Sequence, residues 1–134
     1  MIYKVKSIFI DKGLSKFKLG NESIKVDVSK DRDENLPGPA ELLLTALSSC
    51  ILKNIERFSE ILKFEYESVH VEIEADRQDS PPKFIAIRYK VFLQTEEDNH
   101  RVDLLHKNIK KFGTVYNSFS EETKIIGEIQ KVEL

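Results

Sequence analysis

This sequence is poor in cysteine, since Cys50 is the only one among 134 residues. A single cysteine excludes an intrachain disulfide and any metal site built from a cluster of cysteines. Basic residues are not in excess either, since 21 lysines and arginines stand against 23 aspartates and glutamates. Without a basic surplus to release counterions, the composition gives no reason to expect a nucleic-acid partner.

Long apolar runs are also absent from the start of the chain. Lysines interrupt the short apolar stretch at residues 2–10, which argues against a signal peptide or a membrane span there. The sequence has no internal repeat, low-complexity tract or long linker. At this length we expect a single domain over residues 1–134 with a core of its own. A cytoplasmic location without membrane contact is the default expectation.

The longest segment with helical apolar spacing is Pro37–Lys63, which carries Cys50. This spacing predicts one long helix. Pro39 suits its first turn, where no backbone N–H is needed, and Glu41 lies near the positive end of the helix dipole. No charge occurs between Glu41 and Lys53, so we expect this half of the helix to be buried on nearly all sides. A second subunit would supply part of that cover.

The remaining segments predict strands and shorter helices around this long helix. Strands are expected at residues 2–10, 17–19, 24–28, 69–75, 85–93 and 123–133, with a loop at Arg77–Lys83. A second helix is expected to begin at the Asp98-Asn99 cap and to end at Gly113, followed by a short helix or turn at 114–121. Because strands and helices do not alternate regularly, the order predicts an α+β fold with largely antiparallel sheets around the long helix.

Two residues of the long helix are candidates for chemistry. Free cysteine is usually a small buried hydrophobe, and a reactive thiolate needs a nearby cation, helix N-terminus or metal. Cys50 is too deep in its helix to use that helix's own dipole, so a cation would have to come from another segment. Nine residues at roughly 100° each place Glu41 about 180° from Cys50 and roughly 13–14 Å along the axis. The two can share a site only across a subunit boundary or through a long bridging cation.

The histidines give no metal signal. His70 falls on the polar face of a predicted strand, and His100 and His106 lie six residues apart on a charged helix, so they do not share a face. Zinc would need closer, convergent ligands. We therefore predict neither a metal nor a cofactor.

The segment PGPAELLLTALSSC resembles the helix signature of the OsmC/Ohr family, the osmotically inducible and organic-hydroperoxide-resistance proteins. In that family a Pro-rich turn leads to an acid, and a run of small residues then ends in the peroxidatic cysteine. Glu41 falls on the acid and Cys50 on the cysteine, at the family's nine-residue separation. The resemblance implies an intertwined homodimer with its sites at the subunit interface. It also implies a cycle in which the cysteine attacks a peroxide, condenses with a second cysteine and is reset by a thiol reductant.

Two elements of that cycle are missing from this chain. The family's second cysteine follows the second helix, where Gly113 and Thr114 stand here. The family arginine, which the acid holds against the thiolate, comes from the N-terminal β region, but residues 1–31 contain no arginine. Lys12 would replace its charge but not its planar fork, and Arg32 stands in a different loop.

The resemblance therefore leaves two functions open, both in oxidative stress. The first is a one-cysteine, thiol-dependent peroxidase of the peroxiredoxin type acting on organic hydroperoxides. Cys50 would be its nucleophile, with Glu41 as orienting acid, Lys12 or Arg32 as thiolate partner, and an external thiol as reductant. The second is a non-catalytic homodimer that binds an apolar small molecule or senses oxidation through Cys50. A purely structural cysteine in a protein of unrelated role is the third reading.

Overall fold

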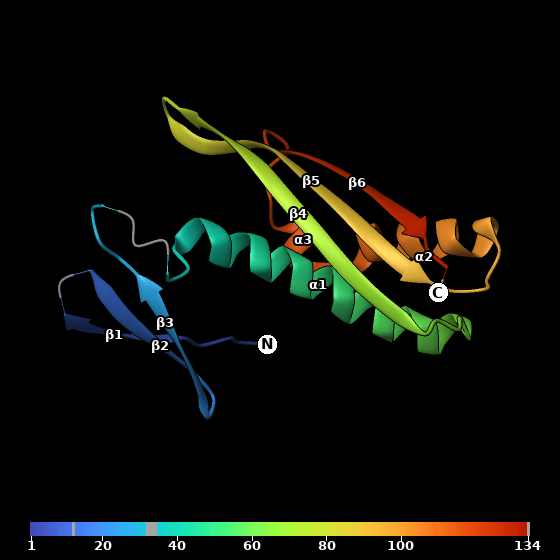
Figure 1. Cartoon of the computed structure of the whole chain (residues 1–134), viewed down its shortest axis with the longest axis horizontal. Coiled ribbons are helices and arrows are strands. Elements are labelled where there is room, and N and C mark those ends of the chain that lie inside the picture. Colours follow the sequence, from blue (N-terminus) through green and yellow to red (C-terminus); the bar gives the residue numbers. More distant parts are fainter. Residues whose placement is uncertain (12, 32–34, 134) are drawn as a thin grey trace. The chain divides into compact units, whose positions relative to one another are not determined.

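The computed structural model describes residues 1–11, 13–31 and 35–133. They form two compact units, Met1–Leu43 and Leu44–Leu134, and each unit is described by itself (Figure 1). In chain order the elements are β1 (Lys6–Asp11), β2 (Leu14–Leu19), β3 (Glu22–Asp27), α1 (Pro39–Leu62), β4 (Ser68–Asp79), β5 (Pro82–Gln94), α2 (Asn99–Phe112), α3 (Thr114–Asn117) and β6 (Lys124–Lys131). The α+β class and the predicted order of elements are confirmed. That the two units fold as a single domain stays a prediction.

The first unit holds an antiparallel sheet in the order β1-β2-β3. Its register places Ser7 opposite Phe17, and Phe17 opposite Ile24, on one face of the sheet. The β2–β3 hairpin turns at Gly20, whose φ of 63° lies in the left-handed region that glycine adopts without steric cost. Pro37 O accepts a hydrogen bond from the backbone N–H of Asp27 at 2.9 Å. This bond connects the end of β3 to the turn that precedes α1.

The second unit holds a mixed sheet in the order β4-β5-β6. Strands β4 and β5 are antiparallel, whereas β6 pairs with β5 in parallel, with Ile87 opposite Ile125. A parallel pair needs a long crossover connection, and α2 and α3 provide it here. The prediction of largely antiparallel sheets therefore holds except for this pair.

The loop predicted at Arg77–Lys83 is wrong in extent. Strand pairing continues from Arg77 opposite Phe84 to Asp79 opposite Pro82, so β4 and β5 form one long hairpin. Pro82 is the first residue of β5, a position where a strand tolerates the missing N–H of proline. Pro81 and Pro82 indicated the position of the β4–β5 turn correctly, but the two strands stay paired up to that turn.

The core of the second unit lies between the sheet and the helices α1 and α2, which pack on the same face of the sheet (Figure 1). Its fully buried residues come from α1 (Leu47, Ile51, Ile55), β5 (Ile87, Val91, Leu93) and α2 (Leu105, Ile109). The residues of α1 and α2 among these lie at helical spacing on each helix, whereas Leu43 and Phe112, which continue the same spacing, are 42% and 44% exposed. No helix in the described part of the chain is both long and apolar enough to cross a membrane.

The first half of α1 is not buried on all sides by the single chain, so its full burial, which the prediction assigned in part to a second subunit, stays a prediction. Leu43 is 42% exposed and Leu52 is 36% exposed. Both belong to the apolar half of the helix, between its first turn and Lys53. Because they are nine residues apart, they lie on opposite sides of the helix, and neither is fully covered by the described residues.

Candidate functional site

Cys50 is a free cysteine at the edge of the core rather than inside it. Helical rotation turns Leu47 and Ile51 fully into the core, and both have no exposed surface. Cys50 lies beside them on α1 and is only partly buried. Its position therefore differs from that of a cysteine that serves as a small, fully buried hydrophobe.

The sulfur of Cys50 has a polar neighbour that the sequence pattern did not identify. Asn54, one turn further along α1, is 7% exposed. Its Nδ2 donates to the backbone O of Cys50 at 2.9 Å and to Cys50 Sγ at 3.5 Å. Within the described part of the chain, Asn54 is the side chain hydrogen-bonded to this sulfur. The available signal was a polar residue on the apolar stripe, four residues after the cysteine.

Gly113 approaches the same sulfur from the end of α2. A Cβ built at Gly113 would lie 3.3 Å from Cys50 Sγ, 3.0 Å from Tyr116 Cβ and 2.9 Å from Ile109 O. The backbone here is extended, with φ −73° and ψ 112°, so the left-handed C′ geometry expected at the helix end is not present. The absence of a side chain instead permits the close approach. The position that the resemblance gives to a second cysteine thus lies directly against Cys50.

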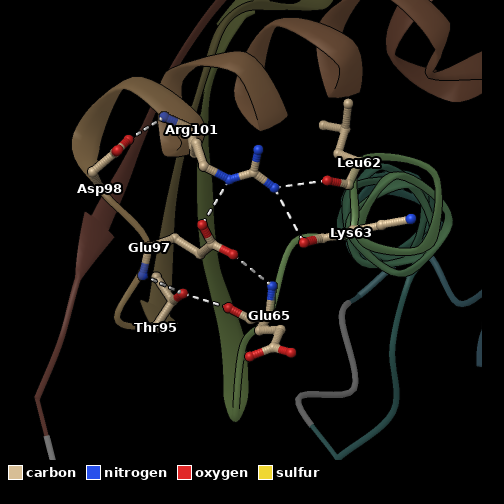
Figure 2. A network of polar contacts seen from close by, with 7 residues as sticks. All are labelled: Leu62, Lys63, Glu65, Thr95, Glu97, Asp98 and Arg101. Carbon is tan, nitrogen blue, oxygen red and sulfur yellow. Dashed lines mark hydrogen bonds and ion pairs between the residues drawn. The ribbon is translucent and has the colours of Figure 1, made fainter.

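The helices that bring Cys50 and Gly113 together are tied at their opposite ends by Arg101 (Figure 2). Its Nη2 donates to Leu62 O at 2.7 Å and to Lys63 O at 3.1 Å, the carbonyls of the last residue of α1 and of the residue after it. Its Nε donates to Glu97 Oε2 at 2.6 Å. A cation placed here also complements the negative end of the α1 dipole.

Glu97 extends this network to the chain that leaves α1. Its Oε1 accepts a hydrogen bond from the backbone N–H of Glu65 at 3.0 Å. Lys63, which joins the two segments, has a φ of 50°, a left-handed conformation that is unfavourable without glycine. The network therefore fixes a strained helix end and, with it, the pairing of α1 with α2.

The other residues predicted for the site are not brought together with Cys50. Glu41 lies in the first turn of α1, and its Oε2 would be 3.4 Å from a Cβ at Gly38. It is not a free carboxylate. Because Glu41 and Cys50 belong to different units, a site shared by the two stays a prediction. Lys12 and Arg32 lie outside the described residues, so the cationic partner of the thiolate also stays a prediction.

Metal ligands do not gather anywhere in the part of the chain that the structure describes. Residues 1–11, 13–31 and 35–133 hold no group of three His, Cys, Asp or Glu side chains arranged to bind an ion.

His106 is partly buried although it lies on a charged helix. Its Nε2 lies 2.6 Å from the hydroxyl of Tyr89, and the ring packs edge-on against Tyr89 at 5.7 Å. Tyr89 in turn packs edge-on against Tyr116, which lies beside Gly113. The spacing of His106 from Val102 and Ile109 could have placed it on the buried stripe of α2. This cluster supports the segment that contacts Cys50.

Burial sets the ionisation of this cluster. It lowers the pKa of His106 to about 4, assisted by the charge of Lys110 and opposed by that of Asp103. Burial also raises the pKa of Tyr89 and of Tyr116. All three rings are therefore neutral at neutral pH.

Acidification is expected to destabilise the protein through His106. Its folded-state pKa of about 4 lies below the ordinary value of about 6.5. Between these values the unfolded chain binds more protons than the folded one, so stability falls as the pH falls. Because solvent screens part of the effect on a half-buried ring, we expect a loss of about 1–2 kcal/mol. Denaturant unfolding at about pH 6.5 and about pH 4 measures it.

The matched variant for this experiment is His106→Gln, which keeps an acceptor for the Tyr89 hydroxyl and does not titrate. The carboxylates of Asp76 and Glu122, whose pKa values are lowered by Arg88 and Lys83, contribute equally in both proteins. The variant should therefore lose less stability than the wild type over this interval. An equal loss would show that His106 is not responsible.

Comparison with known proteins relates the sequence to one protein family and the structure to solved structures of the same fold. A family model described as OsmC-like protein matches residues 32–127. An OsmC-like protein from Mycoplasma pneumoniae is similar in structure, with a TM-score of 0.90, 13% identity and 98% of each chain covered. No curated protein matches the sequence.

Two further solved structures are organic hydroperoxide resistance proteins. That of Legionella pneumophila has a TM-score of 0.78 at 12% identity, with 97% of this chain and 98% of the other covered. OhrB of Bacillus subtilis has a TM-score of 0.68 at 13% identity, with the same coverage. At these identities the likeness establishes the fold alone.

Proposed function

The chain belongs to the OsmC-like protein family, and from this premise we propose that it is an oxidative-stress protein that reduces organic hydroperoxides through Cys50 alone. The single observation that carries the proposal is the position of Cys50. It is a free, partly buried cysteine beside the fully buried Leu47 and Ile51, on the helix that carries the resemblance to the family. The absence of any other cysteine from the sequence makes an external thiol the reductant.

The proposed reaction balances with two classes of co-reactant. The Cys50 thiolate attacks the distal oxygen of the hydroperoxide, an S–O bond forms, and the O–O bond breaks. The alkoxide leaves and takes up a proton as an alcohol, so sulfur is oxidised to a sulfenic acid while the peroxide is reduced. One external thiol then forms a mixed disulfide and releases water. A second external thiol releases the thiol disulfide and restores Cys50.

Turnover with small thiols tests this proposal. We expect the wild-type protein to consume an organic hydroperoxide such as cumene hydroperoxide continuously when a monothiol or a dithiol is present. Cys50→Ser should consume none above the rate of the thiol alone. A wild-type rate no higher than that of Cys50→Ser would contradict the proposed catalysis.

A non-catalytic role is the second candidate, and one observation favours it. Within the described residues, the sulfur of Cys50 has the neutral amide of Asn54 as its hydrogen-bonding side chain, whereas a reactive thiolate is usually stabilised by a positive charge. On this alternative the protein would sense oxidation or bind an apolar small molecule. A single oxidation of Cys50 without turnover by external thiols would support it over the peroxidase.

We also propose that a second copy of the chain covers the apolar half of α1. Leu43 and Leu52 are exposed there, and their nine-residue separation places them on opposite sides of the helix, so the second copy would have to enclose this half rather than lie along one side of it. A homodimer should therefore show twice the chain mass in light scattering, and Leu52→Glu should reduce that mass to one chain. Ile126→Glu, the same type of change at another exposed apolar residue, should leave the dimer intact. A wild-type monomer would contradict the proposal.

The location of the protein in the cytoplasm stays a prediction.

A further inference from the structure

We infer that Asn54 is a catalytic residue, whose amide N–H groups stabilise the anionic sulfur of Cys50. This inference rests on the proposed function, because it concerns the same sulfur. The sequence offered Lys12 and Arg32 as replacements for the family arginine, but neither lies within the described residues. Asn54 is the group that the structure places in hydrogen-bonding contact with the sulfur.

The backbone of α1 fixes the place of the amide. Asn54 Nδ2 donates to Cys50 O at 2.9 Å, four residues back along the helix, and lies 3.5 Å from Sγ. An amide nitrogen carries two hydrogens. One can therefore bond the carbonyl while the other faces the sulfur. The first bond holds the donor in position before the reaction begins.

Burial strengthens the effect of this donor. Asn54 is 7% exposed, so water competes little for its N–H groups, and hydrogen bonds gain electrostatic strength in such surroundings. Hydrogen bonding to the charged form of a group favours that form. The amide would therefore stabilise the thiolate that attacks the peroxide and the sulfenate that the attack produces.

The surroundings of the sulfur on the opposite side are consistent with this role. Gly113 presents backbone to Sγ, and Tyr116 is the titratable residue next to it. Burial raises the pKa of Tyr116, so its hydroxyl is neutral when a thiolate forms. Tyr116 therefore adds no negative charge against the thiolate.

Substitution of Asn54 by leucine tests the inference with two readouts. The first is the second-order rate of Cys50 oxidation by cumene hydroperoxide. The second is the pH profile of Cys50 alkylation by iodoacetamide, which reports the thiolate fraction. We expect the oxidation to slow by about tenfold and the alkylation profile to move up by about one pH unit, the size of a lost hydrogen bond to a charged group.

A control and a second variant keep the test decisive. Asn108→Leu removes a matching bond, because Asn108 Nδ2 donates to Leu104 O at 2.9 Å, but it has no hydrogen bond to the sulfur. This variant should keep wild-type kinetics. Asn54→Asp has the shape of asparagine and replaces the donor by a carboxylate, so it should slow the reaction even if Asn54→Leu does not fold. Wild-type rates and an unchanged alkylation profile in either folded Asn54 variant would overturn the inference.

The two readouts also separate this inference from the proposed function. If wild-type Cys50 does not react with hydroperoxide but Asn54→Leu moves the alkylation profile, the peroxidase proposal fails and the role of Asn54 in stabilising the thiolate stands. If wild-type Cys50 reacts and both readouts are the same in the folded variants, the inference about Asn54 fails alone.

Discussion

Replacing Gly127 by alanine is expected to destabilise the protein by about 3 kcal/mol or more, at the upper end of the cost of overpacking a core. A Cβ at this position would lie 1.9 Å from Tyr89 Cζ and 2.2 Å from both Cε atoms of the ring. Gly127 is directly opposite Tyr89 in the β5–β6 pair. The ring therefore crosses the backbone of the neighbouring strand, and only glycine leaves room for it.

Tyr89 cannot move aside without further losses. Its hydroxyl lies 2.6 Å from His106 Nε2, and its ring packs edge-on against Tyr116. Tyr89 itself is 3% exposed. A shift of the ring would break a buried hydrogen bond, and a shift of β6 would disturb the parallel pair of strands.

Denaturant unfolding measures this cost, with Gly38→Ala as the matched control. A Cβ at Gly38 would meet only Glu41 Oε2 at an ordinary 3.4 Å, so that variant should stay within about 0.5 kcal/mol of the wild type. Combining Gly127→Ala with Tyr89→Leu should cost less than the two single changes together, because the smaller side chain relieves the clash. Strict additivity would show that Gly127 and Tyr89 do not compete for the same space.

Gly113→Cys is expected to create an intrachain disulfide with Cys50 when one equivalent of an organic hydroperoxide is added. A Cβ at residue 113 lies 3.3 Å from Cys50 Sγ, close to the roughly 3 Å that separates a Cβ from the far sulfur of a disulfide with ordinary bond lengths. The new thiol would attack the sulfenic acid of Cys50 and release water. Both free thiols should then disappear together, and a dithiol should restore them.

The control for this experiment is Gly113→Ala, which adds the same Cβ without sulfur. It should lose about 1–2 kcal/mol of stability, because the new carbon would lie 2.9 Å from Ile109 O and must displace it slightly. It should form no intrachain crosslink. If Gly113→Cys kept two free thiols after peroxide, or formed only crosslinks between chains, Gly113 would not lie against Cys50 as described.

Sequence patterns captured the elements of this fold because its helices and strands have regular apolar spacing. The stripe through Leu47, Ile51 and Ile55 gave the buried face of α1, and the helix signature around Cys50 gave the family. The apolar and turn patterns failed to predict where strand pairing begins and ends. The extent of the β4–β5 hairpin depends on cross-strand partners such as Arg77 and Phe84, which local turn residues do not reveal.

The candidate site was predictable only in part, for a related reason. Cys50 could be identified from its own segment. The roles of Asn54 and Gly113 become visible only from their distances to the Cys50 sulfur. Asn54 looked like one polar residue in a helix, and Gly113 looked like a helix-ending glycine. Asn54 reaches the sulfur along α1 itself, whereas only the packing of α2 against α1 shows that Gly113 lies against it.

The most direct test of the central claim is to trap Cys50 after a single reaction. The wild-type protein is mixed with one equivalent of cumene hydroperoxide in the presence of dimedone, and the modified residue is identified by mass spectrometry. One dimedone adduct on Cys50, absent from Cys50→Ser and formed without loss of protein to crosslinks, is the predicted result. A Cys50 that stays an unmodified thiol under these conditions would contradict the account.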